Sequence, residues 1–114
     1  MADNTVKIAV LVSGGGTNLQ ALIDAEKRGE LGCGRISLVL ASKPGVYALE
    51  RAKANNIDSV ILPRKEYDSI AEYSKALADT LAGAGVDLVV LAGFLTIFDG
   101  QIFKSKISSL KCMA

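Results

Sequence analysis

Short apolar runs alternate with helical patterns along this chain, and this alternation constrains its fold more than any other feature. Val6–Val12 is a continuous apolar run rich in β-branched residues, typical of a strand buried on both faces of a parallel sheet. Three further runs lie at 36–40, 60–62 and 86–91, and apolar residues at helical spacing fill the intervals between them. The alternation predicts one α/β domain with an open, mostly parallel, Rossmann-like sheet of four strands and helices on both faces.

Polar residues and glycines mark the ends of the predicted helices. The first helix follows a run of three glycines, where Thr17 is the expected N-cap and Gln20 completes a capping box. Gly29 is the expected end of this helix. Ser69 and Glu72 form a second capping box, which predicts the start of the third helix.

Composition and charge exclude several classes of protein. The 114 residues are enough for one domain, and half of them are hydrophobic, which excludes a disordered or low-complexity chain. The sequence has thirteen Lys and Arg and twelve Asp and Glu, for a net charge of +1. This charge gives no indication of binding to nucleic acid or to an anionic membrane. The apolar runs are too short to span a bilayer. The sequence contains no histidine, which excludes a histidine-based triad within these residues.

The cysteines and the N-terminus indicate the cellular compartment. Cys33 and Cys112 are far apart and form no CxxC motif, which favours a reducing compartment over a disulfide framework. Two distant cysteines without any histidine also provide no zinc ligand set. Asp3 precedes the first apolar run, and that run ends in Ser13 and glycines, unlike a signal peptide. We therefore expect a cytoplasmic protein without a metal.

Gly14, Gly15 and Gly16 lie between the first predicted strand and the first predicted helix. Successive glycines let the backbone approach a ligand closely, and the free N–H groups of a first helical turn favour an anion. Thr17 and Asn18 add side-chain donors. We therefore predict a phosphate site at this loop in preference to a bare strand-to-helix turn.

The glycine loop departs from two common nucleotide-binding motifs. No GxxxxGK[ST] string of a P-loop occurs in the sequence. In a GxGxxG fingerprint, Leu19 would occupy the place of the third glycine, and the acidic residue expected after the second strand is missing at 41–43. These departures argue against a dinucleotide site.

Three stretches of the sequence read IAVLVSGGGTNLQA at 8–21, LERA at 49–52 and DLVVLAGF at 87–94. Together they resemble the glycinamide ribonucleotide formyltransferases, which are folate-dependent enzymes of purine synthesis. The resemblance implies transfer of a formyl group from the co-substrate 10-formyltetrahydrofolate to the amine of a ribosyl phosphate substrate. It implies that the substrate phosphate is held by Gly15, Gly16, Thr17 and Asn18, and that the pteridine pocket is lined by Leu95, Thr96, Ile97 and Phe98.

The resemblance assigns no catalytic residue to this sequence. The family's Asn-x-His-Pro motif is expected just after residue 111, where the sequence reads Cys-Met-Ala instead, and Ile70 stands where members often have an Arg. We therefore expect residues 1–114 to be a single, truncated N-terminal domain that binds the substrate phosphate and is inactive alone. The tail at 99–114 is expected to be partly helical.

Further expectations and alternatives follow from the same residues. A sheet of four strands would leave its fourth strand at an edge, with Leu88, Val90 and apolar tail residues such as Phe103 poorly covered, so a homo-oligomer through that edge is expected. One alternative function is a non-catalytic nucleotide- or phosphate-binding module on the same sheet. Another is a formyltransferase acting on a different amine, such as a methionyl-tRNA or a sugar nucleotide, although the glycine loop is best explained by a substrate phosphate.

Overall fold

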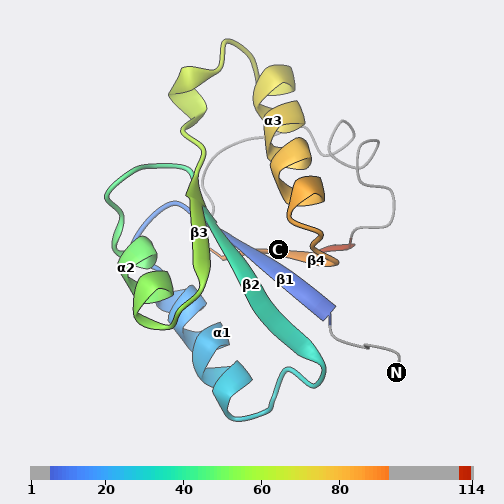
Figure 1. Ribbon diagram of the computed structural model, residues 1–114. Helices are drawn as coiled ribbons and strands as arrows, with labels where there is room; N and C mark the ends of the chain where they lie inside the picture. The colour runs from blue at the N-terminus through green and yellow to red at the C-terminus, as the bar shows by residue number, and fades with distance from the viewer. Residues whose placement is uncertain (1–5, 93–110, 114) are drawn as a thin grey trace.

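A parallel sheet of five strands forms the centre of the computed structural model, which describes residues 6–92 and 111–113 (Figure 1). The strands are β1 (Val6–Val12), β2 (Gly34–Ala41), β3 (Asp58–Ile61), β4 (Leu88–Leu91) and β5 (Lys111–Met113). Their order in the sheet is β3-β2-β1-β4-β5, and every pair is parallel. The chain therefore moves outward from β1 to β3 and then returns to the other side of β1. This reversal places a topological switch point between β1 and β4, where open α/β sheets bind ligands.

Helices cover both faces of the sheet, as the sequence predicts (Figure 1). Helix α1 (Thr17–Lys27) and helix α2 (Tyr47–Ala54) pack on one face, where Leu19, Ile23, Ala48 and Ala52 are buried. Helix α3 (Ile70–Gly83), which follows the short 3-10 helix η1 (Arg64–Glu66), packs on the other face. The predicted open parallel α/β fold is confirmed.

A bulge in β2 decides which of its side chains reach which helices. Ile8 pairs with Ile36, but the next residue of β1 pairs with Leu38, so Ser37 is one residue extra in β2. Side chains alternate along a strand, so Ile36 and Leu38 would share a face without the bulge. With it, Ile36 joins the core under α1 and α2, whereas Leu38 joins the core under α3.

The N-cap predicted for α1 is wrong, whereas the cap predicted for α3 is confirmed. Gly16 is the N-cap of α1, with φ of 81°, and its carbonyl oxygen accepts from the backbone N–H of Gln20 at 2.8 Å. The helical hydrogen bonds therefore begin one residue before Thr17. At α3, the Ser69 hydroxyl accepts from the backbone N–H of Glu72 at 3.1 Å.

The expectation that β4 forms an edge of the sheet is also wrong. β5 pairs with β4 in parallel, from Leu88 opposite Lys111 to Val90 opposite Met113. Leu88 and Val90 are half-buried. The rest of the predicted helical tail lies outside the described residues, as do its apolar side chains. Self-association through a sheet edge stays a prediction, with β3 and β5 as the outermost of the described strands.

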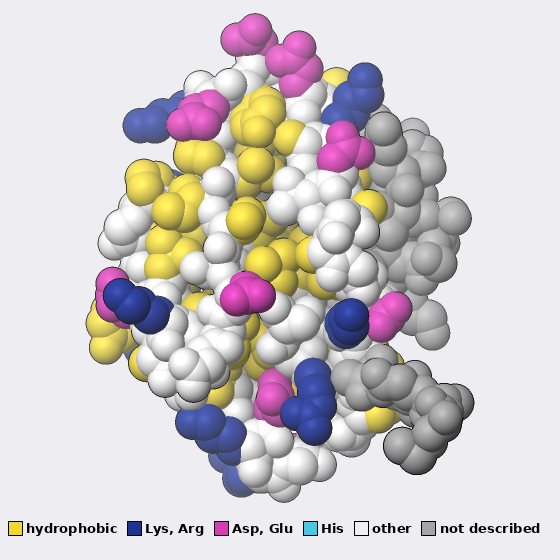
Figure 2. Space-filling view, viewed as in Figure 1, with side chains coloured by type: hydrophobic (Ala, Val, Ile, Leu, Met, Phe, Trp, Pro, Cys, Tyr) yellow, Lys and Arg dark blue, Asp and Glu magenta, His cyan; other side chains and the backbone are white. Residues whose placement is uncertain are grey.

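Large apolar side chains are exposed around the β3 end of the sheet. Figure 2 shows this face, with apolar side chains along its middle and charged side chains around them. The exposed fractions are 60% for Tyr47, 45% for Ile61 and 42% for Ile70. In the described part of the chain, no helix is long and apolar enough to cross a membrane.

Candidate functional site

The glycine loop joins the carboxyl end of β1 to the start of α1, next to the switch point of the sheet. Gly14, Gly15, Thr17 and Asn18 are exposed, and Gly16 is half-buried. The first turn of α1 leaves backbone N–H groups without helical partners, and the helix dipole adds partial positive charge at the same place. The geometry therefore brings Gly15, Gly16, Thr17 and Asn18 together, as the predicted phosphate site requires.

Gly16 is the glycine that the backbone of this loop needs. Its φ of 81° lies in the left-handed region, which side chains with a Cβ rarely adopt. A Cβ at this position would lie 2.8 Å from the Cβ of Ala48 and 3.0 Å from its Cα. Among the described residues, a Cβ at Gly14 or Gly15 would meet no atom within 4 Å. The open space around Gly14 and Gly15 is therefore available to a ligand, whereas Gly16 allows α2 to approach the loop closely.

Arg51 of α2 holds the loop through hydrogen bonds to it and to the first turns of α1. Its Nε donates to the carbonyl oxygen of Gly15 at 2.9 Å, and its Nη1 donates to Oε1 of Gln20 at 3.2 Å. The guanidinium also lies 4.8 Å from the ring centre of Tyr47, in a cation–π contact. The Gly15 carbonyl oxygen is thereby occupied by a cationic donor, so it opposes an anion at the loop less than a free carbonyl oxygen would.

Sequence reasoning missed this role of Arg51. The residue is part of the LERA stretch at 49–52, which contributed to the family resemblance but received no function of its own. It is 36 positions from Gly15, so no local pattern links the two residues. Gln20 was expected to complete a cap, yet its side chain bridges Arg51 and Asp24 instead, donating to the Asp24 carboxylate at 3.0 Å.

Two buried serines fix the loop to the neighbouring strand. The hydroxyl oxygens of Ser13 and Ser42 lie 2.7 Å apart, which ties the carboxyl end of β1 to that of β2. The backbone N–H of Ala48 also donates to the carbonyl oxygen of Gly14 at 3.3 Å. Ser42 stands in the segment whose lack of an acidic residue argued against a dinucleotide site. The structure gives this segment a positioning role in the loop.

A hollow opens at the switch point beside Asn18. It has a volume of about 330 Å³, and the described residues that line it are Asn18, Ala21, Leu22, Val90, Leu91 and Ala92. This volume lies in the range of roughly 300–1,000 Å³ that small-molecule sites occupy. Its walls come from α1 and from the end of β4, so a molecule bound there would also reach the glycine loop. The predicted pteridine residues Leu95, Thr96, Ile97 and Phe98 lie outside the described residues.

The described part of the site has the chemistry of binding rather than of proton transfer. It offers backbone N–H groups, the Thr17 hydroxyl and the Asn18 amide, and the sequence contains no histidine. Among the described residues, no three His, Cys, Asp or Glu side chains come together as a metal site. The arrangement therefore suits an oxyanion such as a phosphate.

The fold and this loop define an open α/β domain with an exposed glycine loop at the switch point of its sheet. The formyl transferase family matches residues 6–111, and the chain belongs to that family. The resemblance found in the sequence is thereby confirmed.

Within this family, the chain is similar to proteins named for one reaction and to a solved structure of such a protein. Phosphoribosylglycinamide formyltransferase of Haemophilus influenzae is 43% identical over 91 residues, which are 80% of this chain and 42% of the relative. Trifunctional purine biosynthetic protein adenosine-3 of Drosophila melanogaster is 42% identical over 105 residues, which are 91% of this chain and 8% of the relative. The crystal structure of glycinamide ribonucleotide transformylase 1 from Symbiobacterium toebii matches with a TM-score of 0.82 at 35% identity, covering 93% of this chain and 50% of that one. The chain thus spans about half or less of the length of these relatives.

Proposed function

We propose that this chain provides the substrate-phosphate site of a phosphoribosylglycinamide formyltransferase of purine biosynthesis. The observation that carries the proposal is the exposed loop at 14–18, which Arg51 and Gly16 hold at the switch point of the sheet. Membership of the formyl transferase family and the names of the relatives support the same reaction. The formyl donor would be a folate, 10-formyltetrahydrofolate, and no metal takes part in this proposal.

In the proposed reaction, the amine of glycinamide ribonucleotide attacks the formyl carbon of the donor. A C–N bond to the substrate amine forms, the bond from the formyl carbon to the folate nitrogen breaks, and the amine proton passes to that nitrogen. The loop would bind the phosphate at the backbone N–H groups of Gly15 to Asn18, far from the reacting amine of the same molecule. Holding the phosphate restricts the motion of the substrate and so contributes orientation. We assign no acid–base step to the described residues.

The domain that carries this site, its compartment and its partner are part of the same proposal. We propose that residues 1–114 act as a single N-terminal domain, that the reaction takes place in the cytoplasm, and that the partner is a small ribosyl phosphate rather than nucleic acid or a membrane. Leu95 to Phe98 would line the pteridine pocket. A non-catalytic phosphate-binding module is the second candidate, because the described loop offers donors and no general base.

A titration followed by NMR tests the phosphate assignment. Glycinamide ribonucleotide added to the ¹⁵N-labelled chain should shift the amide signals of Gly15 to Asn18, and Gly15→Val should weaken that binding. Shifts that occur elsewhere and spare this loop would show that the assignment is wrong.

An assay of formyl transfer distinguishes the enzyme from the non-catalytic module. If the chain is part of the enzyme, formyl transfer should occur only when acid–base groups from outside these residues are supplied, and the purified chain alone should show none. Formyl transfer by the chain alone would contradict the absence of an acid–base step.

A further inference from the structure

A second cavity lies at the carboxyl ends of β2 and β3, one strand away from the glycine loop. Its volume is about 480 Å³, and its described lining residues are Ser42, Lys43, Pro44, Pro63, Arg64 and Lys65. Such a volume falls in the range of roughly 300–1,000 Å³ found for small-molecule sites. It lies on the side of the sheet where open α/β folds bind their ligands. The proposed phosphate site does not use it.

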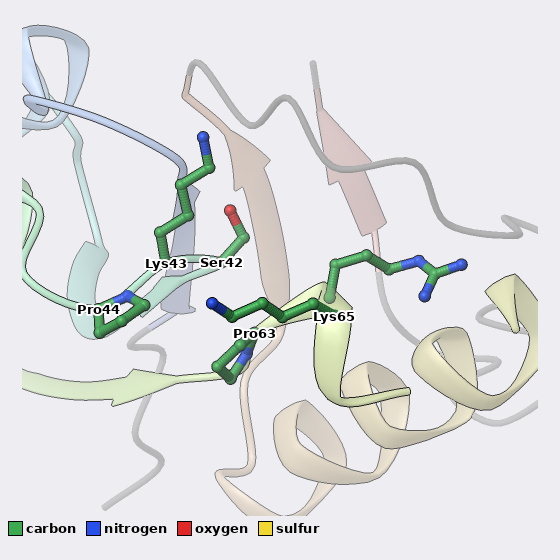
Figure 3. A pocket seen from close by; sticks show the side chains of 6 residues that line it. Ser42, Lys43, Pro44, Pro63 and Lys65 are labelled. Carbon is green, nitrogen blue, oxygen red and sulfur yellow. The ribbon is translucent and has the colours of Figure 1, made fainter. Parts of the chain in front are cut away.

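Three of these lining residues are cations, and none is an acid. Figure 3 shows Lys43 in the loop after β2, and Lys65 extending from η1 back toward the loop that carries Lys43 and Pro44. Within the described residues, the one ion pair is between Arg28 and Glu30, so neither lysine has a carboxylate within 4.0 Å there. Lys43 and Lys65 bring two like charges to one cavity from two separate loops, and a bound anion would be attracted to both.

The cavity is also held in shape by contacts around its rim. Nη1 of Arg64 donates to the carbonyl oxygen of Tyr67 at 2.8 Å, and its guanidinium lies 5.9 Å from the ring centre of Tyr73. Pro44 and Pro63 fix the backbone of the two loops that form the walls. Ser42, on the wall nearest to β1, bonds to Ser13 at the start of the glycine loop. These contacts hold the Arg64 side chain and the walls of the cavity, whereas the exposed side chains of Lys43 and Lys65 can adjust to a ligand.

We propose that this cavity is a second anion subsite, and that its ligand is an oligoanion with two or more phosphate or carboxylate groups. A single phosphate would fill little of the cavity and could not engage cations that approach from two separate loops. The apolar proline rings suit the carbon atoms that connect such groups. A nucleotide polyphosphate and an oligocarboxylate tail share this chemistry. The proposal does not depend on formyl transfer.

Titration with two probes tests the subsite and separates the two sources of ligand. Inorganic tripolyphosphate represents a nucleotide polyphosphate, and γ-linked triglutamate represents a carboxylate tail. Either probe should shift the amide signals of Ser42, Lys43 and Lys65 in the ¹⁵N-labelled chain, and the tighter of the two identifies the source. If neither probe shifts these signals, the proposal is overturned, whether or not the glycine loop responds. Failure of ribosyl phosphate to bind the glycine loop would instead affect only the proposed function.

Charge-removing variants give the second part of the test. Lys43→Gln combined with Lys65→Gln should weaken probe binding at least about tenfold, because two charge-assisted contacts are lost. Lys53→Gln combined with Lys75→Gln removes the same charge from exposed positions on α2 and α3 and should leave binding within about twofold. Without probe, the cavity variant should unfold at about the same urea concentration as the original chain, since both lysines are exposed and neither forms an ion pair with a described residue. Equal loss of binding in both double variants would overturn the proposal.

Discussion

Nε of Arg51 donates a hydrogen bond of 2.9 Å to the carbonyl oxygen of Gly15, and this bond joins the middle of α2 to the glycine loop. The same guanidinium reaches Gln20 on the first turns of α1, so one side chain connects the loop, α1 and α2. Arg51 can do this because its planar guanidinium carries donors on three separate nitrogens in a fixed fork, whereas all the donors of a lysine lie on one nitrogen. The order of the loop before any ligand arrives therefore depends on a residue from the next helix.

Arg51→Lys should weaken ribose 5-phosphate binding nearly as much as Arg51→Met does, by about five- to tenfold, because losing one such bond costs about 1 kcal/mol. The lysine keeps the charge but cannot hold Gly15 and Gln20 together. Isothermal titration calorimetry measures the affinities. Lys53→Met, two residues further along α2, is the control and should change the affinity little. Full rescue by the lysine variant would mean that Arg51 acts through its charge alone.

Replacing glycines in the loop should separate stability from binding. Gly16→Ala should lower the free energy of unfolding by about 1–3 kcal/mol, because the left-handed φ and the contact with Ala48 both oppose a Cβ. Gly15→Ala should change it by no more than about 1 kcal/mol, because its Cβ meets no described atom within 4 Å. Urea unfolding followed by circular dichroism gives both values. Equal destabilisation by the two changes would contradict the special place of Gly16.

The parallel sheet could be predicted from the sequence because burial on both faces leaves a visible mark. Strand β1 is apolar apart from Lys7, and β2 is apolar from Leu38 to Ala41, whereas a strand with one face in solvent alternates apolar and polar residues. The short strand β5 leaves no such mark, because three residues form no pattern. The four-strand sheet expected from the sequence is therefore one strand short of the observed one.

The details of the candidate site were less accessible to sequence reasoning. The three glycines look alike in the sequence, and only the packing of Ala48 against the loop distinguishes Gly16 from its neighbours. Thr17 is the residue type that usually caps a helix, and the sequence therefore predicts it as the N-cap. Gly16 takes that position instead, because glycine can adopt the left-handed conformation there without a side-chain hydrogen bond. The link between Arg51 and Gly15, and that between Ser13 and Ser42, join distant residues across the sheet. The anion loop itself was predictable because it needs only neighbouring residues.

Thr17 and Ser69 should respond to alanine in opposite ways. Ser69→Ala should lower the free energy of unfolding by about 1 kcal/mol, because its hydroxyl caps α3 at the N–H of Glu72. Thr17→Ala should change stability by less than about 0.5 kcal/mol, since Thr17 is exposed and Gly16 is the N-cap. Thr17→Ala should instead weaken phosphate binding, because we expect the Thr17 hydroxyl to donate a hydrogen bond to the phosphate. Unfolding curves and phosphate titrations of both variants test the pair, and unchanged binding in Thr17→Ala would remove Thr17 from the site.

Tyr73 should make stability depend on alkaline pH. Its side chain is fully buried under the sheet, and its hydroxyl donates to the carbonyl oxygen of Leu62 at 2.9 Å. Burial raises the pKa of Tyr73 from 10.0 to about 12, because the charged phenolate is poorly solvated there. Between these two values the unfolded chain releases the phenolic proton and the folded chain keeps it. The contribution of Tyr73 is therefore complete below pH 10 and decreases as the pH rises toward 12.

Tyr73→Phe provides the measurement, because phenylalanine keeps the ring and removes both the hydrogen bond and the titration. At pH 8 the variant should be less stable than the original chain by about 1 kcal/mol, the usual cost of one such bond. As the pH rises above 10, the original chain should lose stability faster than the variant, so the difference between them should shrink. Urea unfolding of both proteins at a series of pH values, followed by circular dichroism, reports this difference directly. A difference that stays constant from pH 8 to pH 11 would show that the Tyr73 hydroxyl titrates alike in the folded and unfolded chains.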